Sequence, residues 1–263
     1  MKKYLYFIEG LSAFIILILI WHIASVTGIF GRVSVRASQL LLPAPKKVAL
    51  SIYEMTVSGY LPKNILISLI RVIKGFLIAV GIGIPIGILM GLSKHFFHFF
   101  NPIFKLISPV PGVAWVPLAI LWFGLGDKAA IFIITMGAIS PIITNTLQGV
   151  KDVDPILLQA LDTMGASRIQ TIVHCVIPSI IPYIVSGFRL GLGFSWRVVI
   201  AAELVGVPNG LGYVLNVGRS TGQTEITIVT ILCLGIIMIV MDELLFNPIE
   251  KITKNWKYVS NEE

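Results

Sequence analysis

Six long apolar stretches constrain this chain more than any other feature of its sequence. A bilayer core about 30 Å thick is crossed by roughly 20 mostly apolar residues in a helix, and every stretch is close to that length. The stretches cover residues 11–30, 71–92, 102–123, 129–147, 178–204 and 226–246. We therefore expect an all-α polytopic membrane protein with six transmembrane helices, which puts both termini on the same side of the membrane.

Composition supports this fold class. Of the 263 residues, 56% are hydrophobic and 13% are charged, whereas soluble domains carry about 25% charged residues. These values exclude a soluble enzyme with one membrane anchor, and they exclude a disordered chain. The net charge of +7 fits basic loops beside anionic lipid, so we expect a lipid bilayer and no nucleic acid as the partner of these charges.

Two of the stretches have special features. The first follows Lys2 and Lys3, as in a cleaved signal peptide, but the apolar part of such a peptide is usually about 7–15 residues long. This stretch is longer, so we expect a span. The third contains Pro109, Pro111 and Pro117. Because proline removes a backbone hydrogen bond from a helix, we expect this span to be broken.

Charge alone does not orient the chain. Lys and Arg are usually more frequent in cytoplasmic loops. Here the loops on the two sides of the expected spans carry similar numbers of both residues, and Arg71 and Lys74 remove the small remaining difference. The orientation has to come from another feature of the sequence.

Two segments outside the apolar stretches are expected to be structured. Residues 46–57 have amphipathic spacing, which predicts a short helix at the membrane interface. Residues 151–177 form the longest polar segment between two stretches. Asp152 or Asp154 can cap a helix there, with Pro155 in its first turn and Gly165 at its end. A second helix over 167–175 is expected before Pro178 opens the fifth stretch.

The sequence lacks the common motifs of enzymes and metal sites. No Gly-x4-Gly-Lys-Ser/Thr and no His-Glu-x-x-His occurs, so we expect no catalytic residue, no metal and no cofactor bound by this chain. Ser195 could be a nucleophile within the membrane, but no histidine lies at a similar depth. The histidines are expected at span ends and the cysteines as buried thiols. These residues are His22, His95, His98, His174, Cys175 and Cys233.

Small residues in the second stretch predict close helix packing. Gly83, Gly87 and Gly91 recur every four residues, which lets membrane helices approach each other closely. Pro85 lies among them and can kink the helix.

Charged and aromatic residues within the stretches indicate a solute path. A charge at the centre of a membrane helix costs about 2.5–3.5 kcal/mol on insertion scales, so such residues usually face a partner or a wet cavity. Arg197 can attract an anion, Glu203 can serve either structure or a path, and Arg189 is expected to extend toward the interface. The candidate path residues are Trp115, Trp122, Trp196, Arg197 and Glu203.

The polar segment 151–177 resembles the EAA loop of binding-protein-dependent ABC importer permeases. That family has Glu-Ala-Ala, three residues, Gly, nine residues, Ile, one residue and Leu-Pro. Ala160, Gly165 and Pro178 match at this spacing. The remaining motif positions carry other residues, namely Gln159, Leu161, Cys175 and Ile177. Because Gln159 replaces the glutamate, the resemblance implies no acidic contact there.

Five further motifs are similar to the nitrate/sulfonate/taurine branch of that family, and together with the loop they cover the chain from about residue 42 onward. They are Ser68-Leu69-Ile70-Arg71 with Gly75-Phe76, Trp115 to Asp127, Asn145 to Val150, Ala201-Ala202-Glu203, and Gly210-Leu211-Gly212-Tyr213.

The resemblance implies a type I ABC importer permease fold and a division of the chain into three parts. Residues 1–64 hold the first span and the outer amphipathic segment, 65–250 the permease domain with the coupling loop 151–177, and 251–263 a cytosolic tail. It also implies a homodimer in a bacterial or archaeal cytoplasmic membrane. Two separate ATPase subunits use ATP and Mg²⁺, and an extracytoplasmic binding protein delivers the solute.

In such an importer the loop docks on the ATPase, so it is cytosolic and both termini are cytoplasmic. The expected coupling residues are Gln159, Ala160, Leu161, Asp162, Met164, Gly165, Ala166 and Pro178. The expected solute is a small anion such as a sulfonate, taurine or nitrate, and a neutral vitamin precursor is the alternative. A self-contained channel or secondary transporter fits the spans but gives no reason for this loop.

Overall fold

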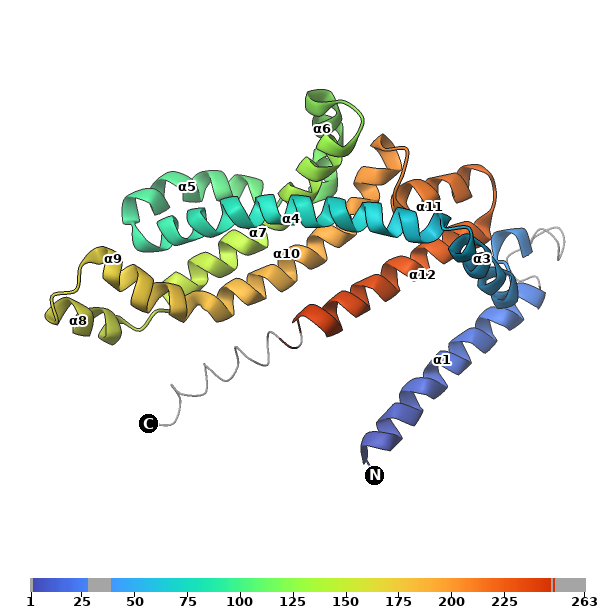
Figure 1. Cartoon of the computed structure of the whole chain (residues 1–263), viewed down its shortest axis with the longest axis horizontal. Coiled ribbons are helices and arrows are strands. Elements are labelled where there is room, and N and C mark those ends of the chain that lie inside the picture. The colour runs from blue at the N-terminus through green and yellow to red at the C-terminus, as the bar shows by residue number, and fades with distance from the viewer. Residues whose placement is uncertain (1, 28–38, 247, 249–263) are drawn as a thin grey trace. The chain divides into compact units, whose positions relative to one another are not determined.

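The computed structural model describes residues 2–27, 39–246 and 248, and these residues form helices without a β-strand. Figure 1 shows the elements in chain order. Their bounds are α1 Lys2–Thr27, α3 Pro45–Val57, α4 Tyr60–Leu92, α5 Lys94–Ile107, η1 Gly112–Trp115, α6 Val116–Phe123, α7 Asp127–Lys151, α8 Pro155–Thr163, α9 Arg168–Thr171, η2 Ile172–Val176, α10 Ile177–Gly206, α11 Leu211–Ser220, α12 Thr224–Met241 and η3 Asp242–Phe246. The η1 segment is a 3₁₀-helix, and η2 and η3 are π-helices.

Four of the described helices are long and apolar enough to cross a bilayer, namely α4, α7, the continuous helix Arg168–Gly206 and the helix Thr224–Leu244. They contain the second, fourth and fifth stretches and most of the sixth. The side chains described in the first stretch belong to an apolar helix, Ser12–Thr27, that is shorter than these four. Residues 28–30 of that stretch and the predicted tail 251–263 lie outside the described residues.

The third stretch is not a single straight span over 102–123. It begins earlier, at Lys94, and consists of α5 and the pair η1–α6, which meet at an angle of 88°. Figure 1 shows α6 turned away from the direction of α5. The bend lies at Pro109 and Pro111, where two residues that cannot donate a backbone hydrogen bond lie close together. Pro102 is tolerated inside α5.

The second stretch also begins earlier than predicted. The helix α4 starts at Tyr60, 11 residues before Arg71, and continues unbroken to Leu92. Residues 60–70, with Lys63 among them, are too polar to count as part of an apolar stretch, although Lys is a good helix former. Hydropathy marks where a helix is apolar, but it does not mark where the backbone stops being helical.

The chain divides into two compact units, residues 1–66 with 209–235 and residues 67–208 with 236–263. In the first unit α1 packs against the segment that leads into α3. Trp21 Nε1 donates to the carbonyl of Pro43 at 3.1 Å, and Ser25 Oγ donates to that of Leu42 at 2.7 Å. The α3 helix occupies the segment predicted to be amphipathic and buries Val48 and Met55. The three-part division of the permease stays a prediction.

In the larger unit α7 and α10 pack against each other, and α4 packs on α7 through a line of small residues. A methyl group added at Gly75, Gly83, Gly87 or Gly91 would come within 2.5–2.8 Å of an α7 side chain. Ala79, in the same four-residue series, is fully buried against Ala138 and Ile142. The predicted packing ladder is therefore confirmed and runs farther than predicted, from Gly75 to Gly91.

Candidate functional site

A helical hairpin joins α7 to α10 and occupies the segment singled out in the sequence (Figure 1). Asp154 caps α8, since its Oδ1 accepts from the backbone N–H of Ile156 at 2.8 Å, and Pro155 occupies the first turn. Gly165 follows α8 with φ of +76°, a conformation that strongly favours glycine. The backbone N–H of Ala166 then donates to the carbonyl of Leu161 at 3.0 Å, which closes the turn in the manner of a Schellman motif.

The second arm of the hairpin continues into α10 without interruption. Ser167 and Gln170 form a capping box at the start of α9, and the helix then runs from Arg168 to Gly206. The predicted second helix over 167–175 is therefore not a separate helix, because it continues through Pro178 into α10. The π-helical turn Ile172–Val176 precedes this proline, and the wider turn accommodates a residue whose ring crowds the carbonyl four positions earlier.

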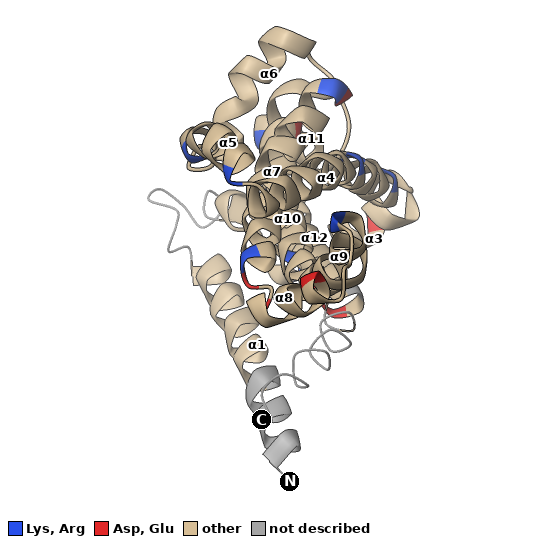
Figure 2. Ribbon diagram, turned by 90° about the vertical axis from the view of Figure 1, so that its left-hand side faces the viewer, with Lys and Arg blue, Asp and Glu red and all other residues tan. Residues whose placement is uncertain are grey.

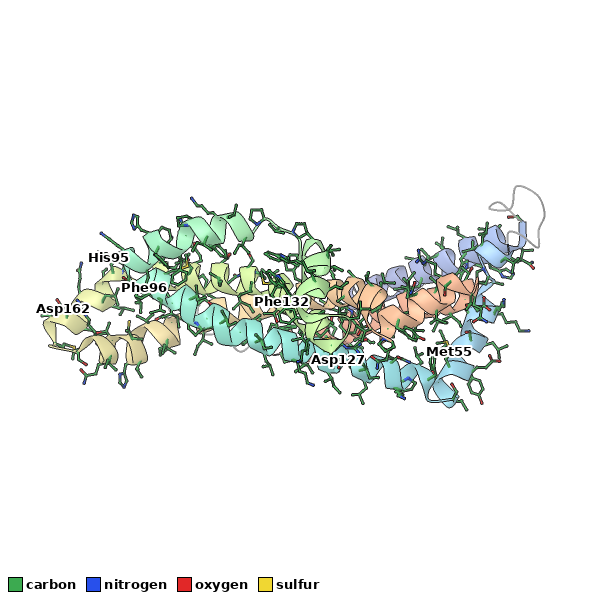
Figure 3. All side chains as sticks on the ribbon, turned by 90° about the horizontal axis from the view of Figure 1, so that it is seen from above. Met55, His95, Phe96, Asp127, Phe132 and Asp162 are labelled. Atoms are coloured by element: carbon green, nitrogen blue, oxygen red, sulfur yellow. The ribbon has the colours of Figure 1, made fainter. Side chains whose placement is uncertain are left out.

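The hairpin is fixed on one side and exposed on the other. Leu158 and Leu161 pack on a buried cluster of Val150, Val153, Cys175, Val176 and Ile180. Four apolar side chains remain 49–82% exposed, namely Ile156, Leu157, Met164 and Ile169. Of the predicted coupling residues, Gln159, Ala160, Asp162, Met164 and Gly165 are exposed, and Leu161, Ala166 and Pro178 are half-buried. Figure 3 shows Asp162 at this end of the larger unit, away from Asp127.

A cluster of polar contacts holds the base of the hairpin. Asp152 accepts from Tyr183 Oη on α10 at 2.7 Å and from Gln148 Nε2 on α7 at 2.8 Å. Beside it, the Nζ of Lys151 lies 4.4 Å from the ring centre of Phe97 on α5. These contacts tie the base of the hairpin to α7 and α10, and Lys151 brings it into contact with α5.

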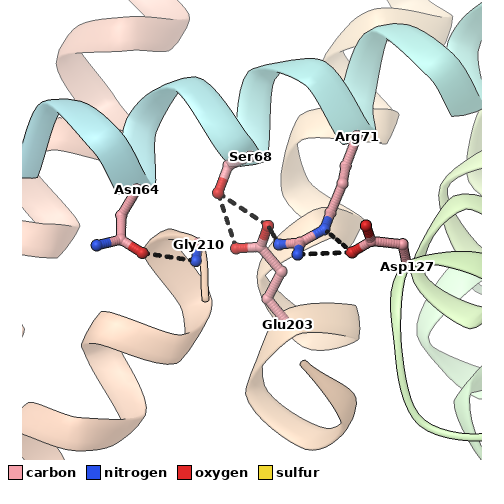
Figure 4. A network of polar contacts seen from close by, with 6 residues as sticks. All are labelled: Asn64, Ser68, Arg71, Asp127, Glu203 and Gly210. Carbon is pink, nitrogen blue, oxygen red and sulfur yellow. Dashed lines mark hydrogen bonds and ion pairs between the residues drawn. The ribbon is translucent and has the colours of Figure 1, made fainter. Parts of the chain in front are cut away.

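A second polar network lies in the larger unit and joins α4, α7 and α10 (Figure 4). Arg71 Nη1 lies 2.7 Å from Glu203 Oε1, and Arg71 Nη2 lies 2.7 Å from Asp127 Oδ1. Ser68 Oγ is 2.8 Å from both carboxylate oxygens of Glu203. Arg71 and Glu203 are buried, whereas the side chain of Asp127 is 66% exposed. Glu203 is thus bound as a structural partner of Arg71.

Sequence reasoning assigned no role to Arg71, Asp127 or Ser68. The one indication in the sequence is that each of them lies within a motif similar to the nitrate/sulfonate/taurine branch. Asp127 opens α7 directly after Gly124 and Gly126, which have φ of +72° and +137°. This turn connects α7 to α6, so Arg71 fixes the point at which the bent third stretch returns to the bundle.

Charged residues are sparse on the ribbon (Figure 2), and the arginines of α10 differ in their partners. Arg189 binds Asp242 through two parallel bonds, Nε to Oδ1 at 2.9 Å and Nη2 to Oδ2 at 2.7 Å. Arg189 therefore has a carboxylate partner, and its extension toward the interface stays a prediction. Arg197 is exposed. Its guanidinium carbon lies 5.7 Å from the ring centre of Phe194, and it has no ion-pair partner among the residues that the structure describes.

The predicted tryptophans fall into two groups. Trp115 and Trp122 lie edge-to-face against Phe132, with ring centres 6.2 and 5.8 Å apart, and Trp122 is 57% exposed. Trp196 is buried. Figure 3 labels Phe132, the ring at the centre of this aromatic cluster near α6.

A cavity of about 700 Å³ lies in the larger unit between α5, the bend after it, α7, α10 and the end of α4. Its wall is mostly apolar, with Phe100, Phe104 and Phe194 among its side chains. Its polar side chains are the hydroxyls of Ser108, Ser140 and Thr144 and the amide of Asn145. None of the five predicted path residues lines this cavity. Sequence reasoning missed it because its wall consists of ordinary apolar residues from helices far apart in the chain.

The alternative of an intramembrane serine enzyme receives no support from the geometry. Ser195 is fully buried, and its Oγ has no hydrogen-bond partner among the described residues. A serine nucleophile is activated by a base within hydrogen-bond reach. The described part of the chain also contains no group of three His, Cys, Asp or Glu side chains that could hold a metal ion.

Residues 83–246 match the family described as the binding-protein-dependent transport system inner membrane component. The chain belongs to this family. The taurine transport system permease of Escherichia coli is 33% identical over 78% of the chain and 76% of its own length. A putative aliphatic sulfonates transport permease of Bacillus subtilis is 34% identical over 82% and 76%, respectively. A nitrate import permease of Leptolyngbya laminosa is 33% identical over 67% and 63%.

A chain of the MetNI methionine ABC transporter in an inward-facing conformation has a similar fold. Its TM-score is 0.56 at 19% identity, and the match covers 70% of this chain and 94% of that one. The predicted type I ABC importer permease fold is thereby confirmed. The chain is a multi-pass permease subunit of an ATP-driven importer in the inner membrane, and its family implies a binding protein and an ATPase as partners.

Proposed function

We propose that this permease works as a homodimer with two separate ATPase subunits, and that the hairpin α8–α9 is the element that docks on the ATPase. The exposed apolar side chains of the hairpin support this assignment, since Met164 and Ile156 are 82% and 70% exposed. Surface residues of this kind, held by a rigid base, are typical of a protein interface. ATP and Mg²⁺ are then used by the partner, and this chain is not itself an enzyme.

The hairpin can transmit force in both directions because it is continuous with the membrane helices. α9, η2 and α10 form one helix of 39 residues, and Asp152 ties the other arm to Tyr183. A movement imposed by the ATPase therefore reaches α10 without passing through a flexible loop. On this proposal the hairpin is cytosolic, both chain termini are cytoplasmic, and the binding protein approaches from the opposite side.

We further propose that the transported solute is a small anion delivered by that binding protein. The relatives named after taurine, aliphatic sulfonates and nitrate support an anion. Arg197 supports it as well, because an intramembrane arginine without a protein carboxylate is suited to an anionic ligand. Direct titration of the partner binding protein with taurine, nitrate and a neutral vitamin precursor tests this, and binding of the neutral compound alone would refute it.

The docking assignment is tested by Gly165→Asp in the purified importer. A side chain at a φ of +76° costs about 1–2 kcal/mol, and the new carboxylate lies at the turn of the hairpin. We expect loss of ATPase co-purification and of transport, with the permease still in the membrane. Gly222→Asp is the matched control, since Gly222 also has a positive φ, +70°, and open space for a Cβ. Transport at the wild-type rate in Gly165→Asp would overturn the assignment.

A further inference from the structure

The three intramembrane arginines of the larger unit differ in how their charge is balanced. Arg71 lies against Glu203 and Asp127, and Arg189 lies against Asp242. Arg197 is exposed, and its charge is balanced by no carboxylate in the described part of the chain. Its guanidinium is instead stacked near Phe194, at 5.7 Å from the ring centre. It is the arginine of this group that is suited to bind an anion.

Phe194 contacts the guanidinium of Arg197 and also lines the cavity. The cavity holds about 700 Å³, and its lining contains no Asp, Glu, Lys, Arg or His. Small-molecule sites usually have volumes of about 300–1,000 Å³, with mostly apolar walls and a few placed polar groups. An ion that entered this cavity would lose its hydration water without gaining an oppositely charged partner. The part of a ligand inside the cavity is therefore uncharged.

The polar groups of the wall lie together on α7 and at the bend. Ser108 Oγ and Ser140 Oγ are hydrogen-bonded at 2.5 Å, and Thr144 Oγ1 donates to the carbonyl of Ser140 at 3.0 Å. The proline at 141 cannot donate to the carbonyl of Gly137, which also belongs to the wall. A lipid chain or a leucine of a second copy would gain nothing from these acceptors and hydroxyls, whereas a small solute with polar substituents can bind to them.

We infer that the cavity binds the uncharged body of an organic solute whose anionic group contacts Arg197. This inference rests on the proposed function and narrows its substrate class to organic anions with an apolar or aromatic part. Nitrate has no such part and would contact Arg197 alone. Among the solutes after which the relatives are named, the cavity thus favours the organic sulfonates over nitrate.

The test is ligand binding to the purified permease in lipid nanodiscs, followed by saturation-transfer NMR with benzenesulfonate as the probe. We expect saturable binding that nitrate at equal concentration does not displace. Arg197→Gln should weaken binding about tenfold or more, as expected for loss of a charge-assisted hydrogen bond. Arg219→Gln, which removes an exposed arginine of α11, is the control and should leave the affinity unchanged.

Two variants fill the cavity, Ser140→Phe and Thr144→Phe, and each should abolish saturable binding while the protein keeps its elution volume and melting temperature. Thr144 is exposed, so its replacement leaves the core packing intact. Ser186→Phe is the control, because Ser186 makes the same hydroxyl contact to the carbonyl four residues earlier but lies outside the cavity.

Three outcomes would overturn the inference. They are absence of saturable benzenesulfonate binding, equally strong competition by nitrate, and equally tight binding of benzyl alcohol, which has the same body without the charge. None of these results depends on the ATPase. If benzenesulfonate fails to bind while Gly165→Asp still prevents ATPase co-purification, the cavity assignment falls and the proposed function stands.

Discussion

Arg71 on α4 and Glu203 on α10 form a buried ion pair with 2.7 Å between Nη1 and Oε1, although 132 residues separate them in the chain. Ser68 also donates to this carboxylate, and Asp127 contacts the other side of the guanidinium. Together these residues join three membrane helices at one point. Because Glu203 is buried and Asp127 is 66% exposed, removing the two carboxylates should lower the stability of the protein by unequal amounts.

Removing one buried partner should destabilise the permease. Glu203→Gln leaves the guanidinium of Arg71 with the partly exposed Asp127, and breaking a buried pair in this way costs about 3–5 kcal/mol. Asp127→Asn should cost far less, because that side chain is 66% exposed and exposed pairs contribute about 0–1 kcal/mol. Melting temperatures in nanodiscs measure both. Equal losses in the two variants would contradict the burial difference.

The effect of replacing a glycine of α4 by alanine should depend on how close the added methyl group comes to a neighbouring helix. At Gly87 a Cβ would lie 2.7 Å from Thr146 Cβ, whereas at Gly81 nothing lies within 4 Å. Gly87→Ala should therefore force α4 away from α7 at a cost of about 1–3 kcal/mol. Gly81→Ala should be neutral, and is the matched control. The comparison needs only expression level and thermal stability, and a neutral Gly87→Ala would show that the two helices are free to separate.

The bidentate contact of Arg189 should require arginine. Lysine keeps the charge but cannot form two parallel bonds with Asp242. Arg189→Lys should therefore lose about half of the stability that this contact contributes. Arg189→Gln and Asp242→Asn should each lose nearly all of this contribution. The double variant should be no less stable than either single variant. A double-mutant cycle on the melting temperature measures the coupling. Additive losses would mean that the two residues act independently.

Exposed side chains of the hairpin should affect ATPase binding without affecting stability. Met164→Ala removes an apolar side chain that is 82% exposed, so the permease should melt at its normal temperature. If Met164 is one of the few energetically dominant contacts of the interface, its truncation costs more than about 2 kcal/mol of binding. Val173→Ala, on the second arm of the hairpin and 48% exposed, serves as the comparison. Binding of the purified ATPase to the immobilised permease variants gives both affinities.

Local sequence patterns were sufficient for the helices and for the hairpin. Pro155 and Gly165 each act through the backbone within a few residues, so the first turn and the end of α8 could be predicted correctly. The cap was predicted as Asp152 or Asp154, and the structure selects Asp154. Two helix ends could not be predicted in this way. The helix α4 begins at Tyr60, before its apolar part, because polar residues such as Lys63 also favour a helix. The helix α9–α10 continues through Pro178, because the π-helical turn before it makes room for the proline ring.

The sequence by itself determined that this protein lies in a membrane, that its elements are helices, and where the helical hairpin between α7 and α10 lies. Those properties depend on apolar length and on turn chemistry between near neighbours. Only the tertiary structure decided that Glu203 binds Arg71, that Arg189 binds Asp242 and Arg197 binds no described carboxylate, and that a cavity with uncharged walls lies beside Phe194. These facts depend on which distant residues meet, and one-dimensional spacing contains no information on the rotation of one helix against another.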